Sequence, residues 1–403
     1  MLRRDPEQPW HPSYWLAALG AGGLSISFFM YLMWLVPHQG FPMPTWQHLS
    51  ALLSGTTPLS TGVRPLAILA TLFMLLLALL HFTLLIWNIR EYSAARSTEA
   101  YQRLLGSPSE VQLMAQPLTF AMTVNVCFAL GALCVPGLWS IVEYLFPFAL
   151  LAFTAIGVWS LKLYGRYLSR MLVSGGYRHE EHNHLSPLMA VFTFSMLSVG
   201  FAAPAAMSHL AFVAALAATL SILFLVIAVV SGVLILISGL QAMLQYGLQK
   251  QATPSIWMLI PIMTLLGIEW VRMQHGLSHH FATPVEQGRL FVVLTAIFML
   301  QLGIMLQGYR VMQLNGYLTD HLIGDQRNPV SFGLICPGVA LFVMGMFWWH
   351  LVWVQGGIVT AFGVVYWLGI AVLAVVQFLT LGALLRLSHR LLLHKPVEIA
   401  LME

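Results

Sequence analysis

Residues 211–237 read AFVAALAATLSILFLVIAVVSGVLILI and contain no Asp, Glu, Lys or Arg. Residues 67–89 form a second run of the same kind. In neither run do apolar and polar side chains alternate, as they do along the strands of a membrane barrel. Backbone in lipid must satisfy its own hydrogen bonds, and a helix does so within one segment. The two runs therefore predict membrane-spanning helices.

The composition of the whole chain extends this prediction. Of 403 residues, 59% are hydrophobic and only 8% are charged, whereas a soluble domain is about 25% charged. A water-soluble globule is thus excluded. At about 20 residues a span, the apolar runs predict one all-α transmembrane domain over residues 1–403, surrounded by the lipid bilayer. We expect ten spans, near residues 12–36, 65–90, 114–135, 138–163, 187–207, 209–246, 255–278, 287–312, 329–351 and 356–392.

The basic residues predict the orientation of the spans. All of the 18 Lys and Arg residues except Arg64, Arg272 and Arg289 fall near the chain ends or in the connections after even-numbered spans. Because basic residues are retained on the cytoplasmic side, we expect a multi-pass protein with both termini in the cytoplasm. The net charge of +4 is spread over short connections without a dense basic tract, so no nucleic-acid partner is expected.

A recurring proline indicates an internal repeat. Each odd-numbered span is expected to begin at a proline that follows a polar residue, where the N–H that proline lacks would have no partner anyway. The pairs recur at intervals of 105, 70, 67 and 75 residues and predict five helical hairpins. They are His11-Pro12, Gln116-Pro117, Ser186-Pro187, Thr253-Pro254 and Asn328-Pro329.

The odd- and even-numbered spans differ in composition. The odd spans are rich in small and weakly polar residues, among them Gly20, Gly22 and Gly23 in the first span and Asn125 in the third. Small residues let helices approach one another closely. We therefore expect the odd spans to form an inner ring around a path that Asn125 faces. The more aliphatic even spans are expected in an outer ring against lipid.

Three short motifs resemble those of a known family. They are residues 116–120 (QPLTF), 184–187 (HLSP) and 331–334 (SFGL). With the ten-span layout, they resemble the tellurite-resistance TehA family, which includes the plant slow anion channels and related dicarboxylate and sulfite transporters. The resemblance implies a pseudo-five-fold ring of hairpins in a bacterial inner membrane, usually assembled as a homotrimer. It also implies a pore gate at Phe332, whose ring has room to move beside Gly333.

The sequence departs from the family after the SFGL stretch, where Cys336-Pro337 follows. On this feature the chain is similar to the TsoY (seleno)proteins, a TehA-like branch. That similarity makes Cys336 the candidate for a redox role.

A polar cluster occurs toward the end of the seventh span. Glu269, Arg272, His275 and His279 follow at intervals of three, three and four residues, so on a helix they share one face. Ionisable groups inside a span are functional candidates. Three interpretations remain open: a structural ion pair, a vestibule that attracts anions, and a divalent-metal site. A stable metal site needs a third ligand that the sequence does not assign, so we predict no bound metal.

These features favour a channel or transporter for small inorganic or carboxylate anions over an enzyme, and no cofactor is expected. The sequence has no GxxxxGK loop, which excludes a self-contained ATP-driven pump. Two alternatives remain. One is a quinone-interacting membrane anchor of a redox complex, in which Glu269, Arg272 and His275 would serve the quinone. The other is a membrane redox protein that uses Cys336.

Overall fold

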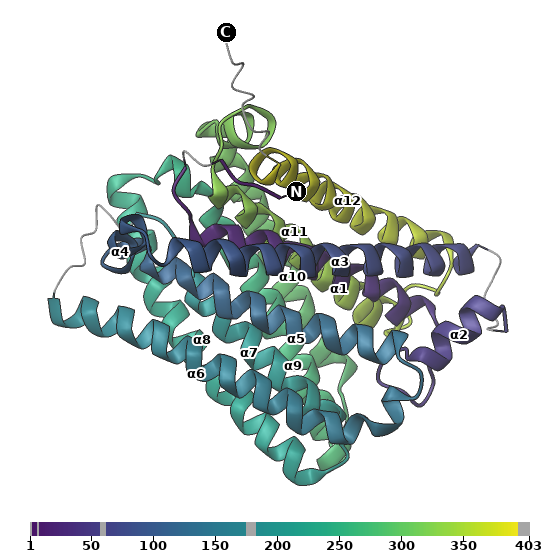
Figure 1. Cartoon of the computed structure of the whole chain (residues 1–403). Coiled ribbons are helices and arrows are strands. Elements are labelled where there is room, and N and C mark those ends of the chain that lie inside the picture. The colour runs from purple at the N-terminus through teal and green to yellow at the C-terminus, as the bar shows by residue number, and fades with distance from the viewer. Residues whose placement is uncertain (1, 6–7, 57–61, 175–182, 394–403) are drawn as a thin grey trace, which may run out of the picture.

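The computed structural model describes residues 2–5, 8–56, 62–174 and 183–393 (Figure 1). Within these ranges the chain is helical, and its one β-type pairing is an isolated bridge between Arg3 and Leu393. Ten of the described helices are long and apolar enough to cross a membrane. Nine of them contain α1 (Trp15–Leu35), α3 (Val63–Ala95), α5 (Ala115–Cys134), α6 (Val142–Ser174), α7 (Leu188–Met207), α8 (Ala211–Tyr246), α9 (Leu259–Phe281), α10 (Gln287–Leu314) and α12 (Val364–Leu392). The remaining one is the ninth span, Pro329–Val354, in which α11 (Ile335–Trp348) lies between a 3₁₀ segment and the π-helix η7 (Trp349–Val354).

The predicted all-helical class and the number of spans are therefore confirmed for the described residues, but several boundaries move. The helix of the fourth span continues to Ser174, beyond the predicted end at residue 163. The tenth begins at Val364 and not at residue 356, because the glycines before it form a loop in which Gly357 has a φ of +73°. Two short helices, α2 (Trp46–Ser54) and α4 (Glu99–Leu105), lie in connections that hydropathy marks only as polar.

The spans that begin at prolines share a tight first turn. Four odd-numbered spans open with a 3₁₀ segment, namely η1 (Pro12–Tyr14), η2 (Pro108–Met114), η4 (Lys250–Met258) and η6 (Pro329–Leu334). In η4 the proline of the predicted Thr253-Pro254 pair lies inside the segment, which begins upstream of it at Lys250. A polar side chain before the proline caps three of these turns by accepting a backbone N–H: His11 from Ser13 at 3.2 Å, Ser107 from Ser109 at 3.2 Å and Asn328 from Val330 at 3.0 Å.

The third span corrects the predicted motif. Its first turn begins at Ser107-Pro108, and Pro117 of the predicted Gln116-Pro117 pair lies inside the first turn of α5. A polar residue followed by proline thus begins the third span as expected, but the pair is Ser107-Pro108 and not Gln116-Pro117.

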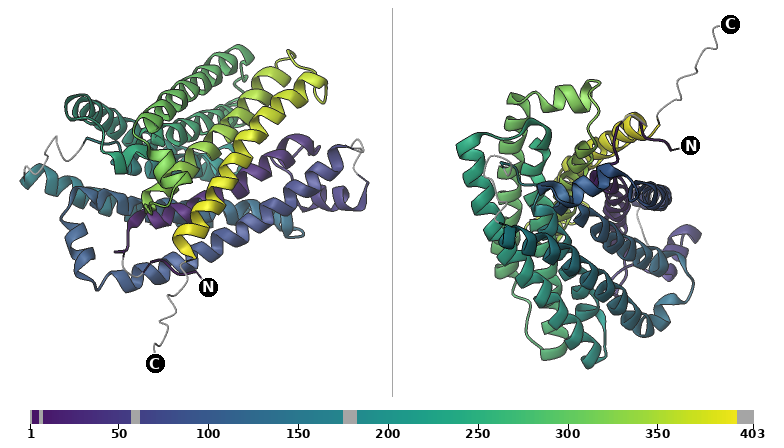
Figure 2. Two further views of the ribbon diagram at one scale, coloured as in Figure 1. Left: turned by 90° about the horizontal axis from the view of Figure 1, so that it is seen from above. Right: turned by 60° about the vertical axis from the view of Figure 1, so that its left-hand side comes forward.

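The packing partners of the helices follow a regular order. Consecutive helices pack in pairs, α1 with α3, α5 with α6, α7 with α8, α9 with α10, and α11 with α12. One member of each pair also packs against members of two others, in the order α1, α5, α7, α9, α11 and back to α1. The first described residues lie beside the end of α12 (Figure 2), where the N–H of Arg3 donates to the carbonyl of Leu392 at 2.7 Å.

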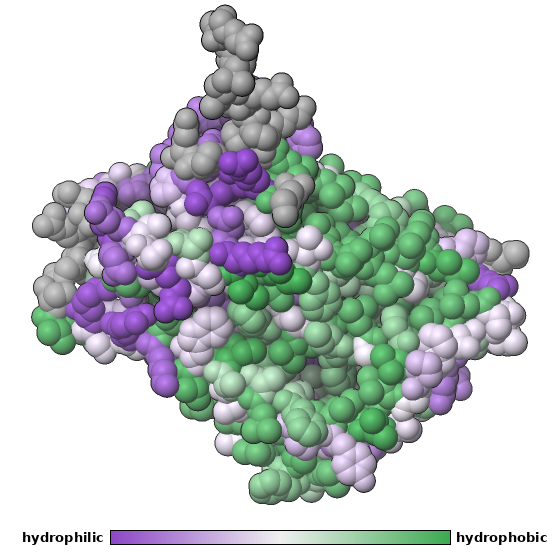
Figure 3. Space-filling model, viewed as in Figure 1, coloured by the Kyte–Doolittle hydropathy of each residue, from purple (hydrophilic) through white to green (hydrophobic). Residues whose placement is uncertain are grey.

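Burial differs between the two members of a pair. Within the most apolar stretch of each span, 89% of the residues are buried in the first span and 94% in the fifth, but only 22% in the sixth. The exposed side chains of α3, α6, α8, α10 and α12 are largely Leu, Val, Ile and Phe. Hydrophobic residues cover a broad band of the surface, and polar residues gather toward α4 and the N-terminal segment and again near α2 (Figure 3). This surface is that of a multi-pass membrane protein.

Candidate functional site

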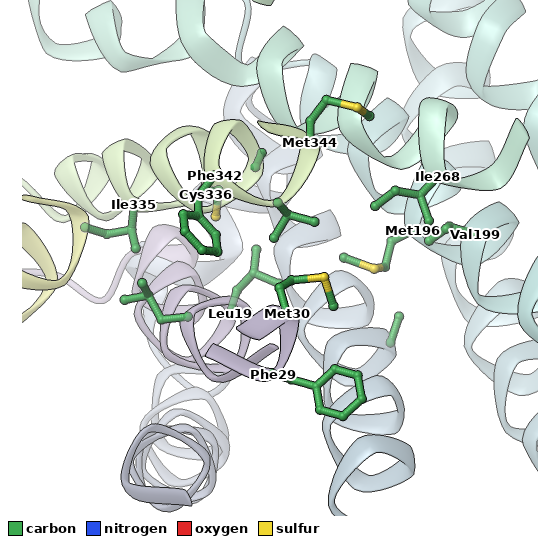
Figure 4. Packing of buried hydrophobic residues seen from close by; sticks show 14 of the residues in the cluster. Leu19, Phe29, Met30, Met196, Val199, Ile268, Ile335, Cys336, Phe342 and Met344 are labelled. Carbon is green, nitrogen blue, oxygen red and sulfur yellow. The ribbon is translucent and has the colours of Figure 1, made fainter. Parts of the chain in front are cut away.

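A cavity of about 570 Å³, called here the large cavity, lies between α1, α5, α7, α9 and α11. Apolar side chains from four of these helices point into the same region (Figure 4), among them Leu19 and Met30 of α1, Met196 of α7 and Ile268 of α9. Further lining comes from aromatic residues, which are Phe29, Trp34, Phe128, Phe146, Phe153, Phe192 and Phe347. The large cavity is therefore an apolar chamber.

A second cavity of about 30 Å³, called here the small cavity, lies at the proline-containing beginnings of the same spans. Its lining includes Ser13, Gln112, Ser186, Ser255 and Gly333, one from each of the five spans. The Ser13 hydroxyl donates to the Gln112 side-chain oxygen at 3.3 Å. In contrast to the large cavity, the small cavity is lined in part by neutral hydroxyl and amide groups.

Phe192, Pro261 and Cys336 line both cavities. We call these three residues the narrow section. All three are buried, and each has one cavity on either side. Pro261 stands out in the sequence as a proline inside an odd span, but Phe192 is one of 23 phenylalanines and no local signal distinguishes it.

The predicted polar cluster of α9 is divided in the structure. Arg272 lines the large cavity, and its guanidinium donates to the carbonyl of Val199 at 2.7 Å. Glu269 is buried against α8, where its carboxylate accepts from the Ser221 hydroxyl at 3.2 Å. The two side chains form no ion pair with each other among the described residues. The structure therefore does not support the interpretation of Glu269 and Arg272 as an ion pair.

The two histidines of the cluster also separate. His275 lines the large cavity. His279 lies outside the cavity lining, and its ring packs edge-on against His209 at 5.0 Å and His280 at 4.6 Å between ring centroids. In the part of the chain that the structure describes, no group of three His, Cys, Asp or Glu residues is placed to hold a metal ion.

The residues assigned to the pore and gate occupy different positions. Asn125 lines the large cavity, where its amide donates to the sulfur of Met196 at 3.4 Å. Gly333 lines the small cavity. Phe332 is completely buried and lines neither cavity; its ring lies 6.4 Å from that of Tyr14. The aromatic side chain between the cavities is Phe192.

Cys336 lies in the narrow section, at the beginning of α11. All three cysteines of the chain are free thiols, and the other two, Cys127 and Cys134, line neither the large nor the small cavity.

No protein-family model matches this sequence, and a comparison with curated proteins finds no match. The functional argument therefore rests on the residues and their geometry.

Proposed function

We propose that this protein is a membrane channel or transporter for anions, and that the anions pass through the large cavity, the narrow section and the small cavity. The observation that carries this proposal is that Phe192, Pro261 and Cys336 line both cavities. Both cavities are lined by the same five spans, so together they form the outline of one path through the helices.

The same proposal includes a pseudo-five-fold ring of five hairpins, with α1, α5, α7, α9 and α11 inside. Its support is the cyclic order of packing, in which α11 returns to α1, and the greater burial of the first and fifth spans than of the sixth. The ring is the arrangement that the resemblance to the TehA family implies. We extend the resemblance to a homotrimer in a bacterial inner membrane.

The charge along the proposed path favours anions. Among the described residues that line either cavity, Arg272 is the one with a fixed charge. A single guanidinium attracts anions and repels cations, and weak contacts elsewhere allow an ion to leave again. The neutral hydroxyls of Ser186 and Ser255 at the small cavity can donate hydrogen bonds to an anion, whereas the Ser13 hydroxyl already donates to Gln112.

The distribution of basic residues supports an orientation for the path. If the beginnings of the odd spans face the cytoplasm, as the positive-inside rule requires, the small cavity is the cytoplasmic side and the large cavity opens toward the outside. Both termini are then cytoplasmic.

The large apolar cavity would suit a quinone, but the carboxylate expected beside the quinone does not line it. Glu269 was expected to serve the quinone together with Arg272 and His275, yet its side chain contacts Ser221 and does not line the large cavity. We therefore favour anion passage.

A thiol-modification experiment tests the path. Cys127→Ser and Cys134→Ser leave Cys336 as the one remaining thiol. The purified protein in liposomes should conduct nitrate or chloride, and a negatively charged methanethiosulfonate reagent should block this flux by attaching a sulfonate at the narrow section. Adding Cys336→Ser should abolish the block. Flux that persists after complete labelling of Cys336 would refute the proposed path.

A further inference from the structure

We infer that the large cavity binds a monovalent organic anion with an apolar body, such as an aryl carboxylate or a medium-chain alkyl carboxylate. This inference rests on the proposed function and names the class of anion that occupies the path.

The walls of the large cavity favour an apolar body. They consist mainly of Leu, Ile, Val, Met and Phe side chains, with aromatic rings from several helices. A strongly hydrated inorganic ion would lose its water here and meet few polar groups in return. An anion whose body is hydrocarbon has little water to lose along that part of its surface and gains by burying it.

The charge of the cavity favours one carboxylate. The guanidinium of Arg272 carries five N–H donors, and the described residues supply one acceptor, the carbonyl of Val199. No described carboxylate pairs with it. The remaining N–H groups can bind the two oxygens of a carboxylate in parallel, which is the preferred geometry of such pairs.

The other polar groups of the cavity add little charge. The Thr264 hydroxyl donates to the carbonyl of Ala340 at 2.9 Å and accepts from the Gln301 amide at 2.7 Å, so its hydrogen bonds are already made within the protein. Asn125 donates to a methionine sulfur, a weak acceptor. His275 also lines the cavity, so its polar lining offers one permanent cation, one amide and one imidazole. With a single fixed charge, this lining suits one carboxylate better than two.

The sizes of the two cavities indicate which of them holds the ligand. At about 570 Å³ the large cavity has room for a drug-sized molecule, whereas the small cavity, at about 30 Å³, holds little more than one water. The apolar body therefore occupies the large cavity, with its carboxylate at Arg272.

Equilibrium binding to the purified full-length protein in lipid nanodiscs tests this inference. Radiolabelled octanoate should bind at least about a hundredfold more tightly than acetate, because six further methylene groups are buried. Arg272→Gln should weaken octanoate binding by about tenfold or more. Arg289→Gln should leave it unchanged, because this exposed arginine pairs with Glu286 at 3.2 Å outside the cavity lining.

A second pair of variants guards against misfolding. Ala203 lines the large cavity, so Ala203→Trp should fill it and abolish octanoate binding. Ala215 is exposed on α8, so Ala215→Trp adds the same bulk on the outer surface and should leave binding intact. Both variants should elute as the wild type does in size-exclusion chromatography.

Equal affinity for octanoate and acetate, or octanoate binding that is insensitive to Arg272→Gln, overturns the inference. Displacement of octanoate by a neutral quinone, equally in wild type and Arg272→Gln, also overturns it. A fatty acid that co-purifies and is displaced by octanoate supports the ligand chemistry and identifies the bilayer as its source. Nitrate flux without octanoate binding refutes this inference alone, and octanoate binding without any anion flux refutes the proposed function alone.

Discussion

The imidazole of His81 occupies the space that a side chain at Gly22 would need: a Cβ atom at Gly22 would lie 2.8 Å from Nδ1 of His81. His81 is completely buried in α3. Its two ring nitrogens lie 2.8 Å from the carbonyl oxygen of Ala18 and 3.0 Å from the hydroxyl of Thr123. One histidine thus joins α1, α3 and α5, which belong to two consecutive hairpins.

We predict that Gly22→Ala destabilises the protein because the added methyl group must displace His81 or the side chain of Met122, which is equally close. Overpacking of this kind costs about 1–3 kcal/mol. The control is Gly382→Ala on α12, where nothing lies within 4 Å of the added atom. Thermal unfolding in detergent should show a lower midpoint for Gly22→Ala and an unchanged or higher midpoint for the control. Equal midpoints would contradict the packing role of His81.

Phe192 and Phe332 are two candidates for the gate, and their substitution should have different effects on flux. Phe192 lies in the narrow section, and Phe332 is the gate that the resemblance implies. Because the ring of Phe192 separates the cavities, we predict that Phe192→Ala raises nitrate flux into liposomes severalfold. If Phe332 only packs against Tyr14, Phe332→Ala should lower stability without raising flux. An increase with Phe332→Ala alone would instead assign the gate to Phe332 and require its ring to enter the path.

The fold class could be predicted because it depends on composition and periodicity. Long uncharged runs such as residues 211–237 form helices in lipid whatever their neighbours are. The extent of α6 was harder to predict, because the helix continues past the apolar segment through Arg166 and Arg170. Both arginines pair with the buried carboxylate of Glu110. Local hydropathy cannot predict an ion pair between residues so far apart in the sequence.

The site could be predicted only in part. Helical spacing placed Glu269 and Arg272 on one face, but a spacing of three residues is still a rotation of about 60° around the axis. This rotation turns one side chain to Ser221 and the other to the large cavity. Phe192 could not be recognised, since its position depends on where α7, α9 and α11 converge.

The separation of Glu269 and Arg272 gives a third prediction. Arg272→Gln should lower nitrate flux at low ionic strength, because it removes the fixed positive charge of the path. The difference from wild type should shrink as salt rises toward 1 M, where the screening length falls to about 3 Å. Glu269→Gln should leave nitrate flux at the wild-type level, because its carboxyl group lies outside the cavity lining. A salt-independent effect of Arg272→Gln would argue for a structural role.

The fourth prediction concerns His11, which precedes the first span. Burial lowers the pKa of His11 from 6.5 to about 4, and its Nδ1 accepts the Ser13 N–H, which only the unprotonated nitrogen can do. The unfolded chain therefore binds a proton that the folded chain rejects between these two pKa values. The stability contributed by the neutral ring is present above pH 6.5 and is lost as pH falls toward 4.

We expect His11→Asn to remove this part of the pH dependence, because an asparagine accepts the same N–H without titrating. Asn328 already has this capping role at the ninth span, with 3.0 Å to the Val330 N–H. The free energy of unfolding, obtained from thermal denaturation between pH 7.5 and 4.5, should fall less steeply for His11→Asn than for wild type, by an amount on the order of 2 kcal/mol at the acid end. His38→Asn is the control, because His38 contacts the carbonyl of Val36 and caps no proline turn. Parallel curves for wild type and His11→Asn would mean that folding leaves the pKa of His11 unchanged, and the first turn would then have to hold Ser13 by another acceptor when the ring is protonated.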